Sequence, residues 1–203
     1  TQGRVQEGRA FLHDVSDTWT DLNSFMVTHN WWHQALFALE LHDHGEALRL
    51  YDTRIWGVVK DYSQDQVNAV SLLARLELCG VDVGERWHDV GQYLAARTAD
   101  HVLPFLDMQY LYGLARAGRP EADVLMRNIE VHAAAAPAHA QHAWQRVALP
   151  ASRDRCTDAT ALVTMYSRCS WDSIRHTSWA WGSIRVFCPS TCRCRSLHST
   201  GFR

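Results

Sequence analysis

The apolar residues of this chain recur at intervals of three and four over most of its length. Within residues 25–41, for example, Trp32, Leu36 and Leu39 fall on one helical face. No segment of the first 150 residues alternates apolar and polar residues with a period of two for long enough to predict a sheet. The spacing therefore predicts an all-α fold.

Glycine and proline mark the ends of several predicted helices. Gly80 and Gly118 stand where a helix ends in the left-handed conformation. Pro104 and Pro120 stand where a first helical turn accepts proline. The predicted helices cover residues 25–41, 46–55, 67–79, 86–97, 105–117, 121–135 and 138–149. Their short connections predict antiparallel helix pairs.

Two of these pairs carry the spacing of a tetratricopeptide repeat (TPR), in which small residues and an aromatic recur at fixed positions. The first copy consists of Trp31, Ala35, Ala47 and Tyr51, and a shorter copy of Gly118, Ala122 and Met126. Small residues let two helices approach closely, and the aromatic residue fills the space beside them. Each pair leaves an apolar face for the next pair to cover, which predicts a stacked α-α superhelix.

Two sequence blocks carry a resemblance to a known family. The block His-Asn-Trp-Trp-His at residues 29–33 and the block Gly-Val-Asp-Val-Gly-Glu-Arg-Trp at residues 80–87 resemble bacterial relatives of tetratricopeptide repeat protein 38. The resemblance covers roughly residues 10–150 and implies a TPR-like all-α fold without a known reaction. A histidine of the family pattern is Gln109 here, so the resemblance does not support a polar site that needs that histidine.

Composition divides the chain at residue 150. Residues 1–150 hold 12 Lys and Arg against 19 Asp and Glu, a net charge of −7, whereas residues 151–203 hold 8 Arg against 3 Asp, a net charge of +5. We expect a helical-repeat domain at 1–150, shorter than in the family. We expect a basic tail at 151–203 that is rich in Cys, Ser and Arg and is poorly ordered or unlike the family. The tail does not continue the family pattern. It is either frameshifted, non-native sequence or a lineage-specific segment that binds an acidic partner.

A non-native tail would leave the last predicted helix, 138–149, without a cap. Its apolar face would then be open, which predicts self-association.

Cys79 is expected to be a small buried hydrophobe. The five tail cysteines match neither a secreted disulfide framework nor a familiar zinc spacing. No secretion leader is visible at the amino terminus, so the expected location is the cytoplasm.

Several classes of partner are not expected. No run of about 18 apolar residues predicts a membrane helix. The basic residues of 1–150 are scattered, so no nucleic-acid partner is predicted. No glycine-rich phosphate loop or nucleophile elbow is visible. The partner expected is a protein or a peptide.

The strongest candidate for chemistry is a histidine pair. His29 and His33 are four residues apart, so both imidazoles lie on one helical face, which is the spacing of paired zinc ligands. Asp52 and Asp107 are the candidates for completing a divalent metal site. The alternative is structural, with histidines that satisfy polar groups beside buried tryptophan. We also expect Asp82 to cap the helix that begins at Arg86 and to pair with that arginine.

Two interpretations of function follow, together with a third in which the chain is a damaged gene product without function. The leading one is a non-catalytic scaffold that binds a peptide or partner protein. The alternative is an enzyme or small-molecule binder, with or without a metal, whose polar pocket is built from His29, His33, Asp52 and Asp107. Trp19, Trp31, Trp32, Trp56 and Trp87 are expected in the core rather than in a ligand cage.

Overall fold

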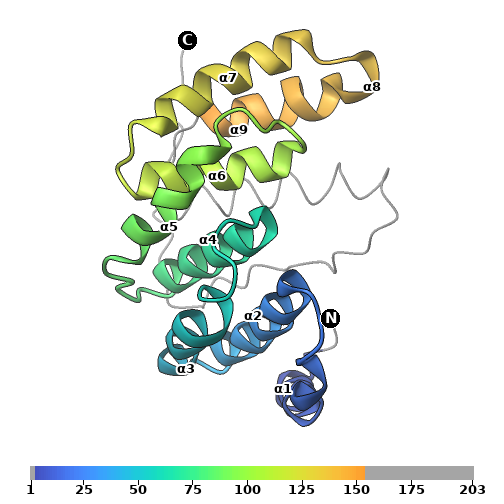
Figure 1. Cartoon of the computed structure of the whole chain (residues 1–203), viewed down its shortest axis with the longest axis vertical. Helices are drawn as coiled ribbons and strands as arrows, with labels where there is room; N and C mark the ends of the chain where they lie inside the picture. Colours follow the sequence, from blue (N-terminus) through green and yellow to red (C-terminus); the bar gives the residue numbers. More distant parts are fainter. Residues whose placement is uncertain (1–2, 154–203) are drawn as a thin grey trace, which may run out of the picture.

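The computed structural model describes residues 3–153, and this part of the chain is helical without strands (Figure 1). The all-α prediction is confirmed. The α-helices are α1 (Val5–Asp14), α2 (Ser24–Glu40), α3 (His44–Leu50), α4 (Ser63–Leu78), α5 (Arg86–Leu94), α6 (Pro104–Arg116), α7 (Glu121–Ala135), α8 (Ala138–Gln141) and α9 (Leu149–Arg153). Short 3₁₀ segments are η1 (Ser16–Trp19) and η3 (Ala95–Arg97), and short π-helical segments are η2 (Tyr51–Ile55) and η4 (His142–Ala148).

The helix ends agree with the expected signals in most places. Gly80 and Gly118 have φ angles of +78° and +64°, in the left-handed region where glycine is unstrained. Pro104 opens α6 at its first position. The start of α4 differs: this helix begins at Ser63 rather than at residue 67. Its first turns bury Asp65 among other polar residues, so the apolar pattern alone did not reveal them.

Two further differences concern local winding and the amino-terminal region. The segments predicted as single helices at 46–55 and 138–149 each contain a π-helical turn, η2 and η4. The helices α1 and η1 were not among the predicted ranges, because their apolar positions are sparse. No residue of α1 is buried.

The helices contact one another in a regular order. Helices α2, α4, α6 and η4 form a contacting series, α2 with α4, α4 with α6, and α6 with η4. The intervening elements η2, α5 and α7 each contact the helix of this series that precedes them and the one that follows. Figure 1 shows the result as a stack that runs from α1–α3 at one end to α7–α9 at the other.

Helix α4 is the centre of the core. Its residues 65–74 are all buried, which fits a helix that contacts α2, η2, α5 and α6. The expectation of core tryptophans is confirmed for Trp19, Trp32, Trp56 and Trp87, which are buried, while Trp31 is partly buried against the core.

Small residues allow the close approaches between helices. Ala35 of α2 and Ala47 of α3 have no exposed surface, as the repeat spacing predicted. In α5, a Cβ on Gly91 would lie 2.4 Å from the Cβ of Ala117, which immediately follows α6. The contact between α5 and α6 therefore requires glycine at residue 91.

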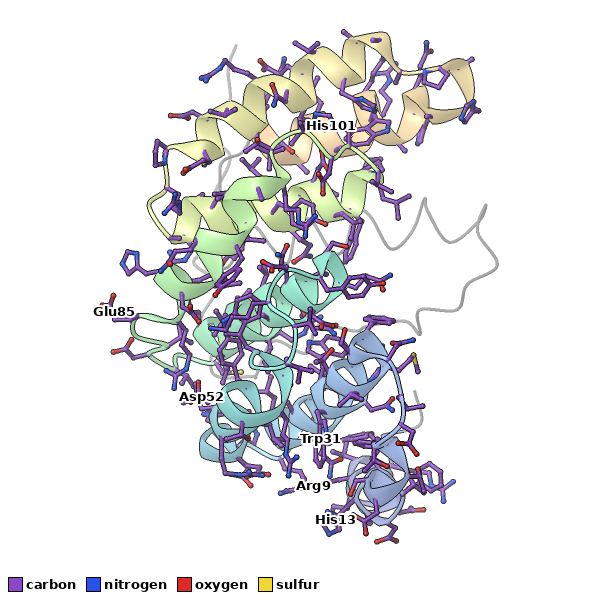
Figure 2. The ribbon with its side chains drawn as sticks, viewed as in Figure 1. Arg9, His13, Trp31, Asp52, Glu85 and His101 are labelled. Atoms are coloured by element: carbon purple, nitrogen blue, oxygen red, sulfur yellow. The ribbon has the colours of Figure 1, made fainter. Side chains whose placement is uncertain are left out.

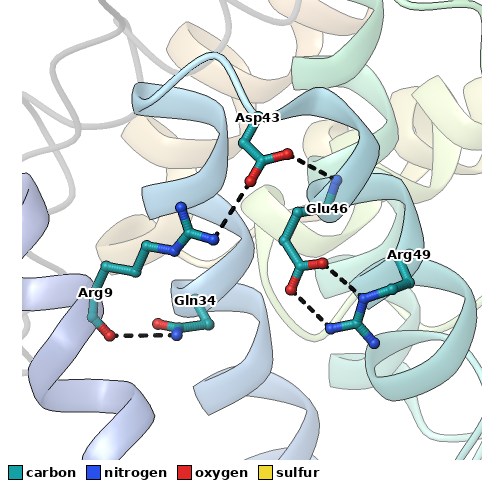
Figure 3. A network of polar contacts seen from close by, with 5 residues as sticks. All are labelled: Arg9, Gln34, Asp43, Glu46 and Arg49. Atoms are coloured by element: carbon teal, nitrogen blue, oxygen red, sulfur yellow. Dashed lines mark hydrogen bonds and ion pairs between the residues drawn. The ribbon is translucent and has the colours of Figure 1, made fainter.

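A polar network ties α1 to the first helix pair (Figure 3). Asp43 caps α3 by accepting a hydrogen bond from the backbone nitrogen of Glu46 at 3.2 Å, and its other oxygen lies 3.4 Å from Nη2 of Arg9. The amide of Gln34 donates to the carbonyl of Arg9 at 3.3 Å. Glu46 also accepts two hydrogen bonds from Arg49. This network positions α1, which buries little apolar surface.

The expected open face at 138–149 is not present among the described residues. Trp144, Val147 and Ala148 are buried, because η4 contacts both α6 and α7. The apolar residues of this segment are thus covered in the structure, and self-association stays a prediction. The tail predictions for residues beyond 153 lie outside the described residues.

Two other expectations concern Cys79 and membrane spans. Cys79 is half-buried against the core rather than fully buried. Burial, followed by the negative charge of Glu40, raises the pKa of its thiol.

Over residues 3–153, no helix combines the length and apolar character that crossing a bilayer requires.

Candidate functional site

The four residues predicted for a metal site do not come together. His29 and His33 are neighbours on α2, but Asp52 in η2 binds the guanidinium of Arg86 through two hydrogen bonds of 2.8 and 2.7 Å. Asp107 in α6 contacts His101, which Figure 2 shows well away from Asp52. Among residues 3–153, no three His, Cys, Asp or Glu side chains are grouped to hold a metal ion.

The expectation that Asp82 caps α5 was wrong, because no side chain caps this helix. The ion pair of Arg86 is with Asp52. The hydrogen bond to Asp52 is the main cause that raises the pKa of Arg86, and the charge of Asp82 only adds to that rise. Asp82 accepts a hydrogen bond from the backbone nitrogen of Gly84 at 2.9 Å and so orders the loop before α5. Arg86 binds Asp52 instead, because η2 lies against α4 and the start of α5 is close by. The carboxylate proposed as a metal ligand thus joins two elements of the fold.

A hydrogen-bonded chain of five side chains links α2 to α4, and we call it the α2–α4 chain. His33 and His29 share a contact of 3.1 Å between their Nε2 atoms, and Nδ1 of His29 lies 3.2 Å from Oδ1 of Asn68. Asn68 donates through Nδ2 to Oγ1 of Thr28 at 3.4 Å, and Thr28 donates to Oδ1 of Asp65 at 2.7 Å.

The amide oxygen of Asn68 fixes the position of the proton on each imidazole. Since the amide oxygen of Asn68 can only accept, Nδ1 of His29 carries the proton. Nε2 of His29 is then the acceptor, and His33 is the donor. All the hydrogen bonds of the α2–α4 chain therefore run from the exposed His33 toward the buried carboxyl of Asp65.

Aromatic rings hold the imidazole of His29 in place. Phe25 stacks on it with ring centroids 5.0 Å apart, and Trp32 stacks at 5.3 Å. Trp32 is itself fixed, because its Nε1 donates to Oγ of Ser71 at 2.9 Å and the guanidinium of Arg75 lies 5.4 Å from its ring centroid. The orientation of His29 is thus set by packing as well as by hydrogen bonds.

The surroundings of the chain disfavour charge. Burial lowers the pKa of His29, an effect that the hydrogen bond to Asn68 opposes. Although His33 keeps an exposed edge, desolvation of its ring and then the proximity of His29 lower its pKa to about 4. Burial likewise raises the pKa of Asp65, against the hydrogen bonds from Thr28 and Ser24. Both imidazoles are consequently neutral at pH 7.

A second cluster lies where α6 begins, and its centre is a histidine that the sequence analysis missed. Nδ1 of His101 is 2.6 Å from Oδ2 of Asp107, whose side chain has no exposed surface. His101 has a φ angle of +45°, which is rare for a residue with a side chain. Its ring stacks on His132 of α7 at 4.8 Å, and His132 contacts Trp144 of η4 at 4.4 Å.

The electrostatics of this second cluster depend on the carboxylate. Burial raises the pKa of Asp107, while the hydrogen bond and charge of His101 act against that rise. Burial and then the charge of His101 lower the pKa of His132.

No spacing rule identified His101, because it stands in a loop. The only sequence signal was a histidine shortly before the proline that opens a helix. Gln109, where the family resemblance has a histidine, is fully buried in α6.

Comparison with known proteins leaves the family open. No model of a known protein family matches this chain, and no solved structure matches it. The similarity to tetratricopeptide repeat protein 38 therefore stays a prediction from the sequence.

Proposed function

We propose that the chain is a TPR-like helical-repeat scaffold that binds a basic segment of a partner protein. The observation that supports this most is the order of helix contacts. In a repeat array, alternate helices contact one another in series, and each intervening helix packs against two of them. Helices α2, α4, α6 and η4, with η2, α5 and α7 between them, follow that order.

The separation of the four candidate pocket residues also favours a scaffold. Asp52 is held by Arg86, and Asp107 is held by His101, so neither carboxylate joins the imidazoles of His29 and His33. The alternative enzyme interpretation needs one pocket built from these four residues, so the contacts of Asp52 and Asp107 count against it.

The charge of the helical region favours a basic partner. Residues 1–150 carry a net charge of −7, and opposite charge on a partner speeds association and orients it. The segment that runs from the last turn of α1 to the start of α2 carries exposed acidic and apolar side chains. Asp14, Asp17 and Asp21 are exposed there, and Phe11 and Leu22 keep 65% and 41% of their surface in solvent.

The test is binding of a fluorescent arginine-rich amphipathic peptide to the full chain, measured by anisotropy. We expect saturable binding that weakens as salt rises, because the attraction is screened. A peptide of the same pattern with glutamate in place of arginine should not bind. Equal binding of both peptides, or of neither, would contradict the proposal.

A matched pair of variants locates the surface. Replacing Asp14, Asp17 and Asp21 together by Asn should weaken peptide binding several-fold. The control changes three exposed acids elsewhere, Glu40→Gln, Asp61→Asn and Glu85→Gln, with the same loss of charge. If both triple variants lose affinity equally, the effect is one of overall charge, and the assigned surface is wrong.

A further inference from the structure

The Nε2 atoms of His29 and His33 are separated by a distance that suits two ligands of one metal ion. They lie 3.1 Å apart. Two imidazole nitrogens on one ion, with bonds of about 2.0–2.1 Å, are separated by about 2.9 Å at a right angle and about 3.3 Å at the tetrahedral angle. We propose that this pair chelates a divalent late transition metal ion of the Ni²⁺, Cu²⁺ and Zn²⁺ class through both Nε2 atoms.

The imidazole of His29 is already oriented as a ligand. Its Nδ1 proton is donated to Asn68, so the lone pair of Nε2 points toward His33. Asn68 is held in turn by Thr28, and Phe25 and Trp32 stack on the ring. A metal-ligating histidine generally donates its other ring proton to an oxygen in this way, which fixes the tautomer and strengthens the ligand.

His33 supplies the route of entry. Its side chain is exposed, so an ion can reach the pair from solvent. The neutral ring of His33 carries one N–H proton, on the Nε2 that faces His29. When the ion binds, this proton moves to Nδ1 of His33, and the ion takes its place between the two Nε2 atoms. Since no third protein ligand is grouped with the pair among residues 3–153, the remaining coordination positions go to water or to donors on a bound partner. The ion is therefore expected to exchange readily.

Two other histidine pairs lack this geometry. His42 lies in the turn before α3 and His44 is the first residue of that helix; their ring centroids are 6.2 Å apart, against 4.6 Å for His29 and His33. His101 and His132 stack nearly in parallel at 23°, and Nδ1 of His101 is bound to Asp107. These pairs serve as internal controls for non-specific binding by histidine.

The experiment is a titration of the full chain with Ni²⁺, followed by the NMR signals of the histidine rings. Paramagnetic broadening should affect His29 and His33 first and should be complete near one equivalent. His33→Ala should abolish this early broadening and lower the Ni²⁺ affinity at least tenfold. The control variant His42→Ala should retain both. Because His33 is exposed, its replacement is not expected to unfold the chain.

A second variant tests the support from Asn68. Asn68→Ala should reduce the Ni²⁺ affinity about 10- to 100-fold, as other losses of a ligand's hydrogen-bond partner do. Asn68→Asp should restore it, because a carboxylate also accepts the Nδ1 proton. The proposal fails if wild type and His33→Ala bind Ni²⁺ equally. It also fails if broadening begins at His42, His44 or His101 instead of at the α2 pair.

Discussion

The two histidine clusters of this protein differ in what holds the imidazole. In the α2–α4 chain, His29 contacts the neutral side chains of Asn68 and His33, and the only carboxyl lies two hydrogen bonds beyond Asn68. In the second cluster, His101 contacts the fully buried carboxyl of Asp107 directly. The same residue type therefore forms a contact with neutral side chains in one cluster and a direct contact with a buried carboxyl in the other.

The position of each cluster in the fold explains the difference. The α2–α4 chain runs across the contact between two long helices and reaches solvent at His33. The pair of His101 and Asp107 joins a loop to the first turns of α6, and the stacking on His132 adds α7. A loop residue with a positive φ angle needs such a contact to remain in place.

The largest effect is expected from loss of the buried carboxyl in the second cluster. Asp107→Ala removes the partner of His101 and leaves that imidazole partly buried without its acceptor. We expect a loss of about 3 kcal/mol in the free energy of unfolding, the size typical of breaking a buried pair. Urea denaturation at pH 7 measures it. A loss below about 1 kcal/mol would mean that the contact does not hold the loop.

A smaller loss is expected when the α2–α4 chain is interrupted. Thr28→Val keeps the shape of the side chain but leaves both the amide of Asn68 and the carboxyl of Asp65 without their hydroxyl partner. The expected cost is about 2 kcal/mol. The matched variant Thr28→Ser keeps the hydroxyl and should cost clearly less. Equal losses would show that the methyl group, not the hydrogen-bonded chain, matters at this position.

The smallest effect concerns the charge at the end of the chain, and it depends on pH. Burial raises the pKa of Asp65, so the folded state binds this proton more tightly than the unfolded chain. The stability that this group contributes is complete below its unfolded pKa of about 3.9 and is lost as pH rises through the folded pKa. Asn cannot ionise and still accepts from Thr28.

Asp65→Asn should therefore gain stability relative to wild type as pH rises from 3 to 7. The difference at pH 7 should stay within about 1 kcal/mol. Thermal unfolding measured across this range is sufficient. If Asp65→Asn instead loses stability relative to wild type as pH rises, folding does not raise the pKa of Asp65. That result would contradict the view that this carboxyl resists ionisation.

The sequence was most informative where packing follows apolar spacing. The ranges 25–41, 105–117 and 121–135 differ from α2, α6 and α7 by no more than one residue at either end, because their buried faces are mostly apolar. In α6 and α7, glycine or proline also marks the ends. The start of α4 was missed, since its buried face there is polar. The π turns η2 and η4 leave no mark in the apolar pattern.

The candidate site was less predictable for a physical reason. Helical spacing places His29 and His33 together, because they are neighbours on one helix. It cannot place Asp52 against Arg86 or His101 against Asp107, since those contacts depend on how loops and helices pack. The role of Asn68 was also hidden, because its partners on α2 are about 40 residues away in the sequence.

Two double-mutant cycles at pH 7 test the central contrast between the two clusters. One cycle combines His101→Ala with Asp107→Ala. The other combines His29→Ala with His33→Ala. Each cycle gives the free energy of coupling between its two side chains from urea denaturation. We predict a favourable coupling of about 2 kcal/mol for His101 with Asp107, and about 0.5 kcal/mol or less for His29 with His33. A coupling for the α2 pair equal to or larger than that of His101 with Asp107 would contradict the account.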